Sequence, residues 1–232
     1  MRLIGLIGGL SWESTAEYYR IINRGAQVRL GGVHSARSLI YSFDFGEIEA
    51  LQKAGDWDAA SALMVDAAQR LERGGADFLV ICSNTMHRMA PAIEAGVTIP
   101  LLHIADPTGA AIVARKFKRI GLLGTAFTME QPFYRSRLEA RFGLEVLVPD
   151  DAGRAAVHRI IYEELVKGVV RDESRAVYRT VIRQLIDAGA EAIILGCTEI
   201  MLLVGDADST VPLFDTTTLH AEAALGRALG DI

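Results

Sequence analysis

Residues 75–85 read GADFLVICSNT, and residues 189–199 read GAEAIILGCTE. Each stretch opens on glycine and alanine, continues as an apolar run and ends on small polar residues. Two further pairs of stretches match in the same order along the chain, residues 2–9 with 118–125 and residues 98–102 with 210–214. Matching segments in a fixed order indicate an internal duplication. The chain is therefore expected to contain two related halves.

The pattern of each half predicts an α/β fold. Residues 56–73 and 172–188 carry apolar residues at helical spacing and end next to glycine. Glycine-bounded apolar runs that alternate with such helices are typical of parallel strands covered on both faces. We expect two pseudo-symmetric, doubly wound parallel-sheet domains with flavodoxin-like halves. The expected domains are residues 1–100 plus 211–232, and residues 101–210.

Composition excludes several classes of protein. Half of the 232 residues are hydrophobic, which allows a large buried core, and the net charge of −5 shows no basic excess for nucleic acid. The apolar stretch at the start is too short to cross a membrane. Two cysteines are too few for a disulfide scaffold and fit a reducing compartment. We expect a cytoplasmic protein with a small-molecule ligand and neither a nucleic-acid nor a membrane partner.

The ends of the repeated strands are the expected functional site. Ligands bind beyond the carboxyl ends of the strands in doubly wound sheets, and residues 83–85 and 197–199 lie there, in the expected crevice between the halves. Cys197 follows an apolar strand and precedes an expected helix start, which favours a lowered thiol pKa. Backbone N–H groups near Asn84–Thr85 and Thr198–Glu199 are expected donors for a carboxylate. A pseudo-twofold pair of strand ends suits proton removal and return on opposite faces of one carbon.

The strings ICSNTMH at residues 81–87 and LGCTEI at residues 195–200 resemble the two signature segments of the aspartate/glutamate racemase family. Residues 5–15, 123–125 and 163–168 extend the resemblance over nearly the whole chain. The match is closest to the bacterial L-aspartate/glutamate-specific subgroup. The resemblance implies a homodimeric racemase that interconverts L- and D-aspartate or glutamate, or a related amino acid, without pyridoxal phosphate, metal or nucleotide.

The two acid/base groups are expected to differ in this chain. The family pattern has cysteine immediately before the Asn-Thr pair, whereas this chain has Ser83 there and Cys82 one residue earlier. The repeat aligns Ser83 with Cys197, and neighbouring strand side chains point to opposite faces. We therefore expect Cys197 and Ser83 as the catalytic pair, with Cys82 as the alternative to Ser83. No arginine for a substrate side-chain carboxylate occurs at residues 44–48, which leaves the preferred amino acid open.

Further substrate contacts are expected where the resemblance is strongest. Lys167 has two readings, a solvated residue at a helix end or a partner of a substrate carboxylate. Ser83 could equally cap a helix, and capping is compatible with anion binding by the same amides. The expected substrate-binding residues are Leu10, Asn84, Thr85, Thr125, Lys167, Thr198 and Glu199.

Other functions on the same sequence pattern stay open. His87, His103 and His220 lack the spacing of metal ligands, so no metal site is expected. Arylmalonate decarboxylases of this superfamily keep only the second-half cysteine, which matches the single thiol expected here, although they lack an Asn-Thr-Met-His string. Maleate isomerase uses two cysteines and fits less well. A non-catalytic small-molecule binding module is the alternative from another class, but it gives Cys197 no reason to lie at a strand end.

Overall fold

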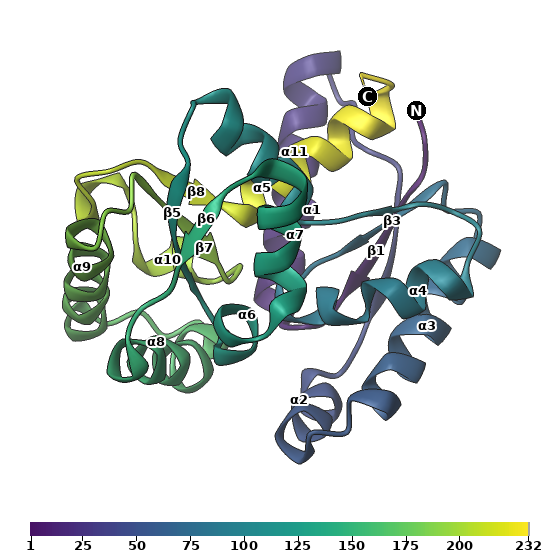
Figure 1. The fold of residues 1–232 in the computed structure, drawn as a ribbon. Coiled ribbons are helices and arrows are strands. Elements are labelled where there is room, and N and C mark those ends of the chain that lie inside the picture. The colour runs from purple at the N-terminus through teal and green to yellow at the C-terminus, as the bar shows by residue number, and fades with distance from the viewer. Residues whose placement is uncertain (232) are drawn as a thin grey trace. The chain divides into compact units, whose positions relative to one another are not determined.

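The computed structural model describes residues 1–231, which form two compact α/β units (Figure 1). The first unit comprises Met1–Ile104 together with residues 220–231, and the second comprises Ala105–Leu219. Each unit contains one four-stranded sheet whose paired strands are all parallel. The predicted fold class, two doubly wound parallel-sheet domains, is confirmed.

The sheet of the first unit has the strand order β2-β1-β3-β4. Its strands are β1 (Ile4–Gly8), β2 (Ser38–Ser42), β3 (Phe78–Ile81) and β4 (Leu101–Leu102). Its helical segments are α1 (Trp12–Leu30), α2 (Phe45–Ala54), α3 (Trp57–Arg73), the 3₁₀ segment η1 (Thr85–Met89), α4 (Ala90–Gly96) and most of α11 (Thr216–Leu229).

The sheet of the second unit repeats this order as β6-β5-β7-β8. Its strands are β5 (Arg119–Gly124), β6 (Glu145–Leu147), β7 (Ala192–Gly196) and β8 (Leu213–Asp215). Its helical segments are α5 (Ala105–Ala114), α6 (Ala126–Glu130), α7 (Pro132–Phe142), α8 (Asp151–Glu163), η2 (Leu165–Lys167), α9 (Asp172–Asp187), α10 (Ile200–Leu203) and η3 (Asp206–Asp208).

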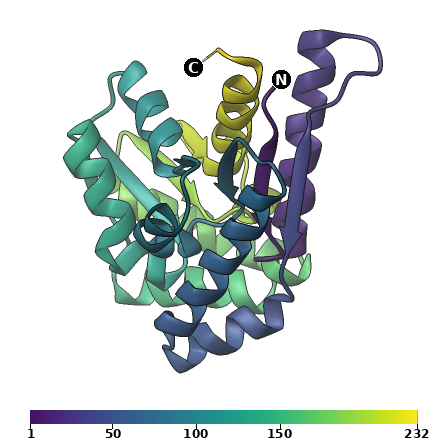
Figure 2. The same ribbon diagram turned by 90° about the vertical axis from the view of Figure 1, so that its right-hand side faces the viewer.

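Central strands of both sheets are apolar because helices cover both of their faces. Every residue of β1, β3 and β7 is buried. In the first unit, Leu79 and Ile81 pack with α2 and α3, whereas Phe78, Val80 and Cys82 pack with α1 and α11. Figure 2 shows the long helix α1 running beside this sheet. The alternation fixes which of the two buried faces of the sheet each side chain of β3 lies on.

The strand order identifies where a ligand belongs in each unit. In the order 2-1-3-4 the chain passes to one side of β1 and then to the other, so the crossovers diverge between β1 and β3. The same divergence lies between β5 and β7. Residues that follow the carboxyl ends of these four strands are therefore the candidates for a functional site.

The two long repeated helices lie close to their predicted bounds. The structure has α3 at Trp57–Arg73 and α9 at Asp172–Asp187. Gly75 and Gly189 follow with φ of 91° and 98°, left-handed values that favour glycine after a helix. Within residues 1–231, no helix combines the length and apolarity that a membrane span needs.

The second domain boundary differs from the sequence-based expectation. Residues 211–219 were expected in the first domain, but β8 pairs in register with β7 and the second unit extends to Leu219. The other boundary, expected after residue 100, lies at Ile104. The short strand β8 is the edge strand of the second sheet, as β4 is the edge strand of the first. Because the two halves are duplicates, β8 belongs to the second domain, which therefore ends later in the chain than expected.

Candidate active site

The turn after β1 is fixed by glycine and a short hydrogen-bonded network. Gly9 has a φ of 71°, and a side chain there would collide with the backbone of Phe43. The Gly9 N–H donates to Thr15 Oγ1 at 2.8 Å, and this hydroxyl donates to the Ser11 carbonyl at 3.1 Å. Leu10, an expected substrate contact, is buried in the core that includes α2 and α3.

Ser83 lies immediately beyond β3, at the predicted place. Its side chain is buried, and its Oγ accepts a hydrogen bond from the Met86 N–H at 3.4 Å. This bond uses the oxygen as an acceptor and leaves the hydroxyl proton available. Asn84 and Thr85 follow as buried residues at the start of η1. Ser83 therefore has the capping role that the sequence allowed, and capping does not exclude proton transfer.

The Ser83 carbonyl is held by a neutral imidazole. His87 Nδ1 lies 2.6 Å from the Ser83 carbonyl oxygen, and the Ile104 N–H donates to His87 Nε2 at 3.1 Å. Because Nε2 accepts, the proton resides on Nδ1 and is donated to Ser83. His87 thus ties the end of β3 to the segment that follows β4.

The histidines that suggested a metal do lie together in the first unit. The ring of His87 is 4.5 Å from that of His103 and 5.7 Å from that of His220, centroid to centroid. His220 uses both nitrogens on Tyr18 and the Leu102 carbonyl. Among the described residues, no group of three histidine, cysteine or acidic side chains could hold a metal ion. The cluster is a hydrogen-bonded part of the core.

Cys82 is a core residue in this structure. It is fully buried among Phe78, Val80 and the α1 and α11 side chains, and its carbonyl accepts from Ser14 Oγ at 3.0 Å. Burial raises the pKa of its thiol far above the ordinary value. The Ser14 hydroxyl bonds the carbonyl of Cys82 and not its thiol.

We expect Cys82→Ala to leave the turnover expected from the sequence resemblance nearly unchanged. The substitution removes one buried sulfur, so the free energy of unfolding should fall by about 1 kcal/mol. Steady-state kinetics and thermal unfolding of the purified variant measure both effects. Loss of turnover in Cys82→Ala, together with full activity of Ser83→Ala, would assign the second acid/base to Cys82.

Cys197 lies immediately beyond β7 and forms a hydrogen-bonded pair with Glu199. Its Sγ donates to Glu199 Oε2 at 3.0 Å, and Thr198 Oγ1 donates to the same oxygen at 2.8 Å. All three residues are buried, with Cys197 at 8% exposure. The end of β7, just before Cys197, is fixed to the start of α11, because Thr216 Oγ1 donates to the Leu195 carbonyl at 2.8 Å. A thiol and a carboxylate therefore share one proton at this strand end.

The expected low pKa of Cys197 is wrong for this conformation. Burial raises the pKa of the thiol well above its usual value, and the charge and hydrogen bond of Glu199 raise it further. The N–H groups of Glu199 and Thr198 lower it but do not prevail. The helix that was expected to begin here is α10, which starts at Ile200 and spans four residues. Cys197 rests as a thiol, and its nearest amides face sulfur.

Three further buried polar side chains of the second unit were missed by the sequence analysis, and one of them, Tyr178, lies within electrostatic range of Cys197 and Glu199. Glu164, at the start of η2, is buried and accepts a hydrogen bond from Ser174 Oγ at 2.6 Å. Tyr178 lies one turn along α9 from Ser174 and is fully buried. Their signal in the sequence is weak, since it consists of two polar residues on the apolar face of residues 172–188.

The other expected contacts of the second half occupy different environments. Thr125 follows β5, is buried and caps α6 by accepting from the Thr128 N–H at 3.2 Å. His158 Nδ1 accepts from the Ala126 N–H at 3.1 Å, beside this cap. Lys167 is exposed at the end of η2. Thr125 thus lies at the carboxyl end of a strand, where the fold favours ligand binding. The exposure of Lys167 favours the alternative of a solvated residue at a helix end.

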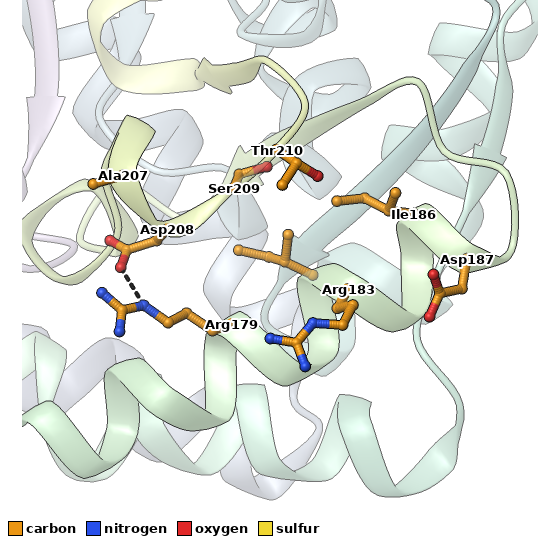
Figure 3. Close-up of a pocket in the computed structure, with 9 residues that line it drawn as sticks. Arg179, Arg183, Ile186, Asp187, Ala207, Asp208, Ser209 and Thr210 are labelled. Atoms are coloured by element: carbon orange, nitrogen blue, oxygen red, sulfur yellow. Dashed lines mark hydrogen bonds and ion pairs between the residues drawn. The ribbon is translucent and has the colours of Figure 1, made fainter.

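A surface pocket of the second unit lies away from these residues. It has a volume of about 550 Å³ and is bounded by α9 and the residues around η3, where Arg179 bonds Asp208 at 2.6 Å (Figure 3). The residues around η3 precede β8, so this pocket is near the amino ends of the strands. None of the expected site residues lines it.

Comparison with known proteins places the chain in a family. The family model described as Asp/Glu/Hydantoin racemase matches residues 7–224, which include both strand ends and the Cys197–Glu199 pair. The chain belongs to the Asp/Glu/hydantoin racemase family. The resemblance drawn from residues 81–87 and 195–200 is thereby confirmed.

Relatives within the racemase family match the whole fold. A crystal structure from Yersinia pestis, of a protein assigned to the Asp/Glu racemases, is 54% identical and has a TM-score of 0.92, over 99% of this chain and 100% of that one. An aspartate racemase homologue from Pyrococcus horikoshii is 32% identical with a TM-score of 0.84, over 99% and 100%. The broad specificity amino-acid racemase RacX of Bacillus subtilis is 24% identical, over 98% of each chain.

Proposed function

We propose that this protein is an amino-acid racemase that acts on aspartate, glutamate or a related amino acid, with Cys197 as its thiol acid/base. The observation that carries the proposal is the 3.0 Å hydrogen bond from Cys197 Sγ to Glu199 at the carboxyl end of β7. A buried thiol paired with a carboxylate forms a proton-transfer unit that a purely structural cysteine does not need. Family membership supports the reaction class.

The first step of the proposed mechanism moves one proton within the pair. The Cys197 thiol transfers its proton to the Glu199 carboxylate, which leaves a thiolate and a neutral carboxylic acid. The N–H groups of Thr198 and Glu199 bond to the sulfur and stabilise the thiolate. The net charge of the pair does not change, so the step is compatible with a buried site.

The second step inverts the α-carbon of the substrate. The Cys197 thiolate removes the α-proton of the L-enantiomer and becomes a thiol again, and the electron pair of the C–H bond moves onto the substrate α-carboxylate. A proton then adds to the opposite face of the planar carbanion to give the D-enantiomer. We assign this second transfer to Ser83 or to a water molecule that its hydroxyl binds, because Ser83 is the counterpart of Cys197 in the repeat. Glu199 then releases its proton to solvent and Ser83 or its water takes one up, so both groups return to the resting state.

This pair of groups is chemically unequal. A serine hydroxyl is a weak base and a weak acid compared with a thiol, so proton transfer at its face should be slower. Enantiomers have equal free energies, so kcat/KM must be equal in the two directions. The difference between the two groups can therefore appear as different kcat and KM values for the two enantiomers, or as exchange of the α-proton without inversion.

We expect L-substrate in deuterated buffer to gain α-deuterium with retention faster than the D-enantiomer accumulates. The Cys197 thiol exchanges its proton with solvent and returns deuterium to the same face more readily than Ser83 supplies one to the other. Ser83→Cys should restore two thiols and raise inversion relative to exchange. A panel of L- and D-amino acids, followed by NMR for deuterium and by chiral chromatography for inversion, measures both rates.

Two outcomes of this panel would count against the proposal. Absence of α-deuterium from every amino acid would leave a binding module as the better function. Equal rates of exchange and inversion in the wild type, unchanged by Ser83→Cys, would remove Ser83 from the mechanism. Ser83→Ala is the matched control, because it deletes the hydroxyl without adding a thiol.

The single thiol also supports a second candidate reaction. Loss of carbon dioxide from an arylmalonate leaves an enediolate that needs one proton donor, and Cys197 could supply that proton. The reaction has no use for an acid/base at Ser83. Incubation with an arylmalonic acid, with product chirality and carbon dioxide as readouts, separates this decarboxylase from a racemase.

We further propose that the protein works in the cytoplasm as a homodimer. Two free buried thiols suit a reducing compartment. The exposed Trp12 and Tyr19, two turns apart on one face of α1, offer apolar surface for a second copy. Sedimentation equilibrium tests the dimer, and a monomer at micromolar concentration would rule it out.

A further inference from the structure

A tyrosine hydroxyl is buried without a hydrogen-bond partner in the neighbourhood of the Cys197–Glu199 pair. Tyr178 is fully buried on α9, and within residues 1–231 its hydroxyl oxygen makes no hydrogen bond. A hydroxyl in this state has lost its bonds to water and gained none in return, which destabilises the folded protein. Such groups are uncommon, and each calls for a physical or functional explanation.

The surroundings of this hydroxyl are acidic. Ser174, one turn earlier on the same face of α9, donates to the buried carboxylate of Glu164 at 2.6 Å. Burial raises the pKa of Tyr178 well above its ordinary value, and the negative charges of Cys197, Glu199 and Glu164 raise it further. The phenol therefore stays protonated at neutral pH, and in the resting state its hydroxyl is a donor without an acceptor.

The charge near Tyr178 changes position during the proposed reaction. In the resting state Glu199 Oε2 accepts from both Cys197 Sγ and Thr198 Oγ1. When Cys197 ionises, the bond from sulfur to Glu199 reverses its direction, and sulfur needs donors. After burial, the charge of Glu199 is the largest cause of the raised pKa of Cys197, and the donors already present are two backbone amides. The phenolic proton of Tyr178 is unused in the resting state, and a small shift of its side chain toward the pair would make it a further donor.

We propose that Tyr178 is a positioning residue whose hydroxyl donates a hydrogen bond to the Cys197–Glu199 pair when the Cys197 thiol is ionised. In the resting state its proton is held in reserve, which explains why a buried hydroxyl is kept without a partner. The contribution of Tyr178 to catalysis rests on the proposed racemisation, whereas the effect of Tyr178 on ionisation of the Cys197 thiol does not. The side chain stabilises the thiolate and so favours proton removal from the substrate.

The test uses Tyr178→Phe in a Cys82→Ala background, where Cys197 is the single thiol. The rate of alkylation by iodoacetamide is followed against pH. Loss of the donor destabilises the thiolate, so the apparent pKa should rise by about one unit, which slows alkylation about tenfold at a fixed pH below it. The matched control is Tyr134→Phe, since Tyr134 is also fully buried and its hydroxyl also makes no hydrogen bond within residues 1–231, but the groups that act on it are Thr108 and Asp106 and not the Cys197–Glu199 pair. The control should leave the Cys197 titration unchanged.

Stability and turnover should move in opposite directions in Tyr178→Phe. Removal of an unpaired buried hydroxyl should leave the melting temperature equal or raise it. At the same time kcat/KM for the L-substrate should fall by roughly tenfold or more, as expected for a hydrogen bond to a charged group. The acid limb of its pH profile should shift to higher pH. A purely structural tyrosine would lower the melting temperature and leave the pH profile in place.

A second substitution tests the same hydroxyl without deleting it. A ring-fluorinated tyrosine at position 178 is a stronger donor of nearly the same shape, so it should lower the apparent pKa of Cys197. An unchanged thiol titration in Tyr178→Phe, or equal shifts in the Tyr134→Phe control, would overturn the role of Tyr178. A shifted titration in a protein that exchanges no amino acid would instead contradict racemisation alone.

Discussion

Cys197→Ser is expected to lower racemisation and α-proton exchange by about 10⁴-fold or more, to the limit of detection. The serine oxygen fills nearly the same space and can still donate to Glu199, so the hydrogen bond seen at 3.0 Å is replaced rather than lost. What disappears is a group that can carry negative charge while it removes a proton. Steady-state assays with both enantiomers and deuterium exchange measure the loss.

The fold should tolerate this change. Circular dichroism and thermal unfolding should match the wild type closely, because no cavity and no unpaired carboxylate are created. Cys82→Ala serves as the matched control, since it removes the other thiol from the core. Turnover like that of the wild type in Cys197→Ser would contradict the proposed mechanism.

Glu199→Gln is expected to raise the reactivity of Cys197 toward alkylation and at the same time to lower turnover. The glutamine keeps the size of the side chain but cannot take up the thiol proton, so kcat/KM should fall by about a hundredfold or more. Burial is the largest cause of the raised pKa of Cys197 and the charge of Glu199 is the next. Loss of that charge should lower the thiol pKa, and alkylation by iodoacetamide should become faster at a given pH.

This opposite movement of two readouts is the informative result. General damage to the site would slow alkylation and turnover together or would lower the melting temperature. Glu163→Gln is a suitable control, because Glu163 is exposed and pairs with Arg159 at 3.5 Å. Unaltered turnover in Glu199→Gln would mean that the Cys197 proton goes elsewhere.

The repeated pattern of the sequence was sufficient to predict both sheets and the position of Ser83 and Cys197. Strand residues such as those of β3 and β7 are apolar because helices bury both faces, and this requirement is visible in the sequence. The alternation along β3 also predicted that Cys82 and Ser83 would differ, and the structure places Cys82 with Phe78 and Val80 in the core. The catalytic roles themselves stay predictions.

The protonation state of Cys197 could not be obtained in the same way. It depends on burial and on the Glu199 carboxylate, which points back to Sγ although the sequence suggested that its backbone would bind substrate. Glu164 and Tyr178 come from separate elements and meet through tertiary packing, which no spacing in the chain records. The end of the first domain was misplaced for a related reason, because the pairing of β8 with β7 is a tertiary contact.

The imidazole that holds the Ser83 carbonyl makes position 83 interchangeable. His87 bonds the main chain of residue 83, and the Ile104 N–H fixes the same ring from its other side, so these contacts hold the backbone in addition to the long bond from the Met86 N–H to Ser83 Oγ. A substitution at position 83 can then change the proton affinity of the side chain while the surrounding backbone keeps its structure. A chain built this way can acquire or lose a second thiol by one codon change, and its two halves are free to diverge in chemistry while they share a fold.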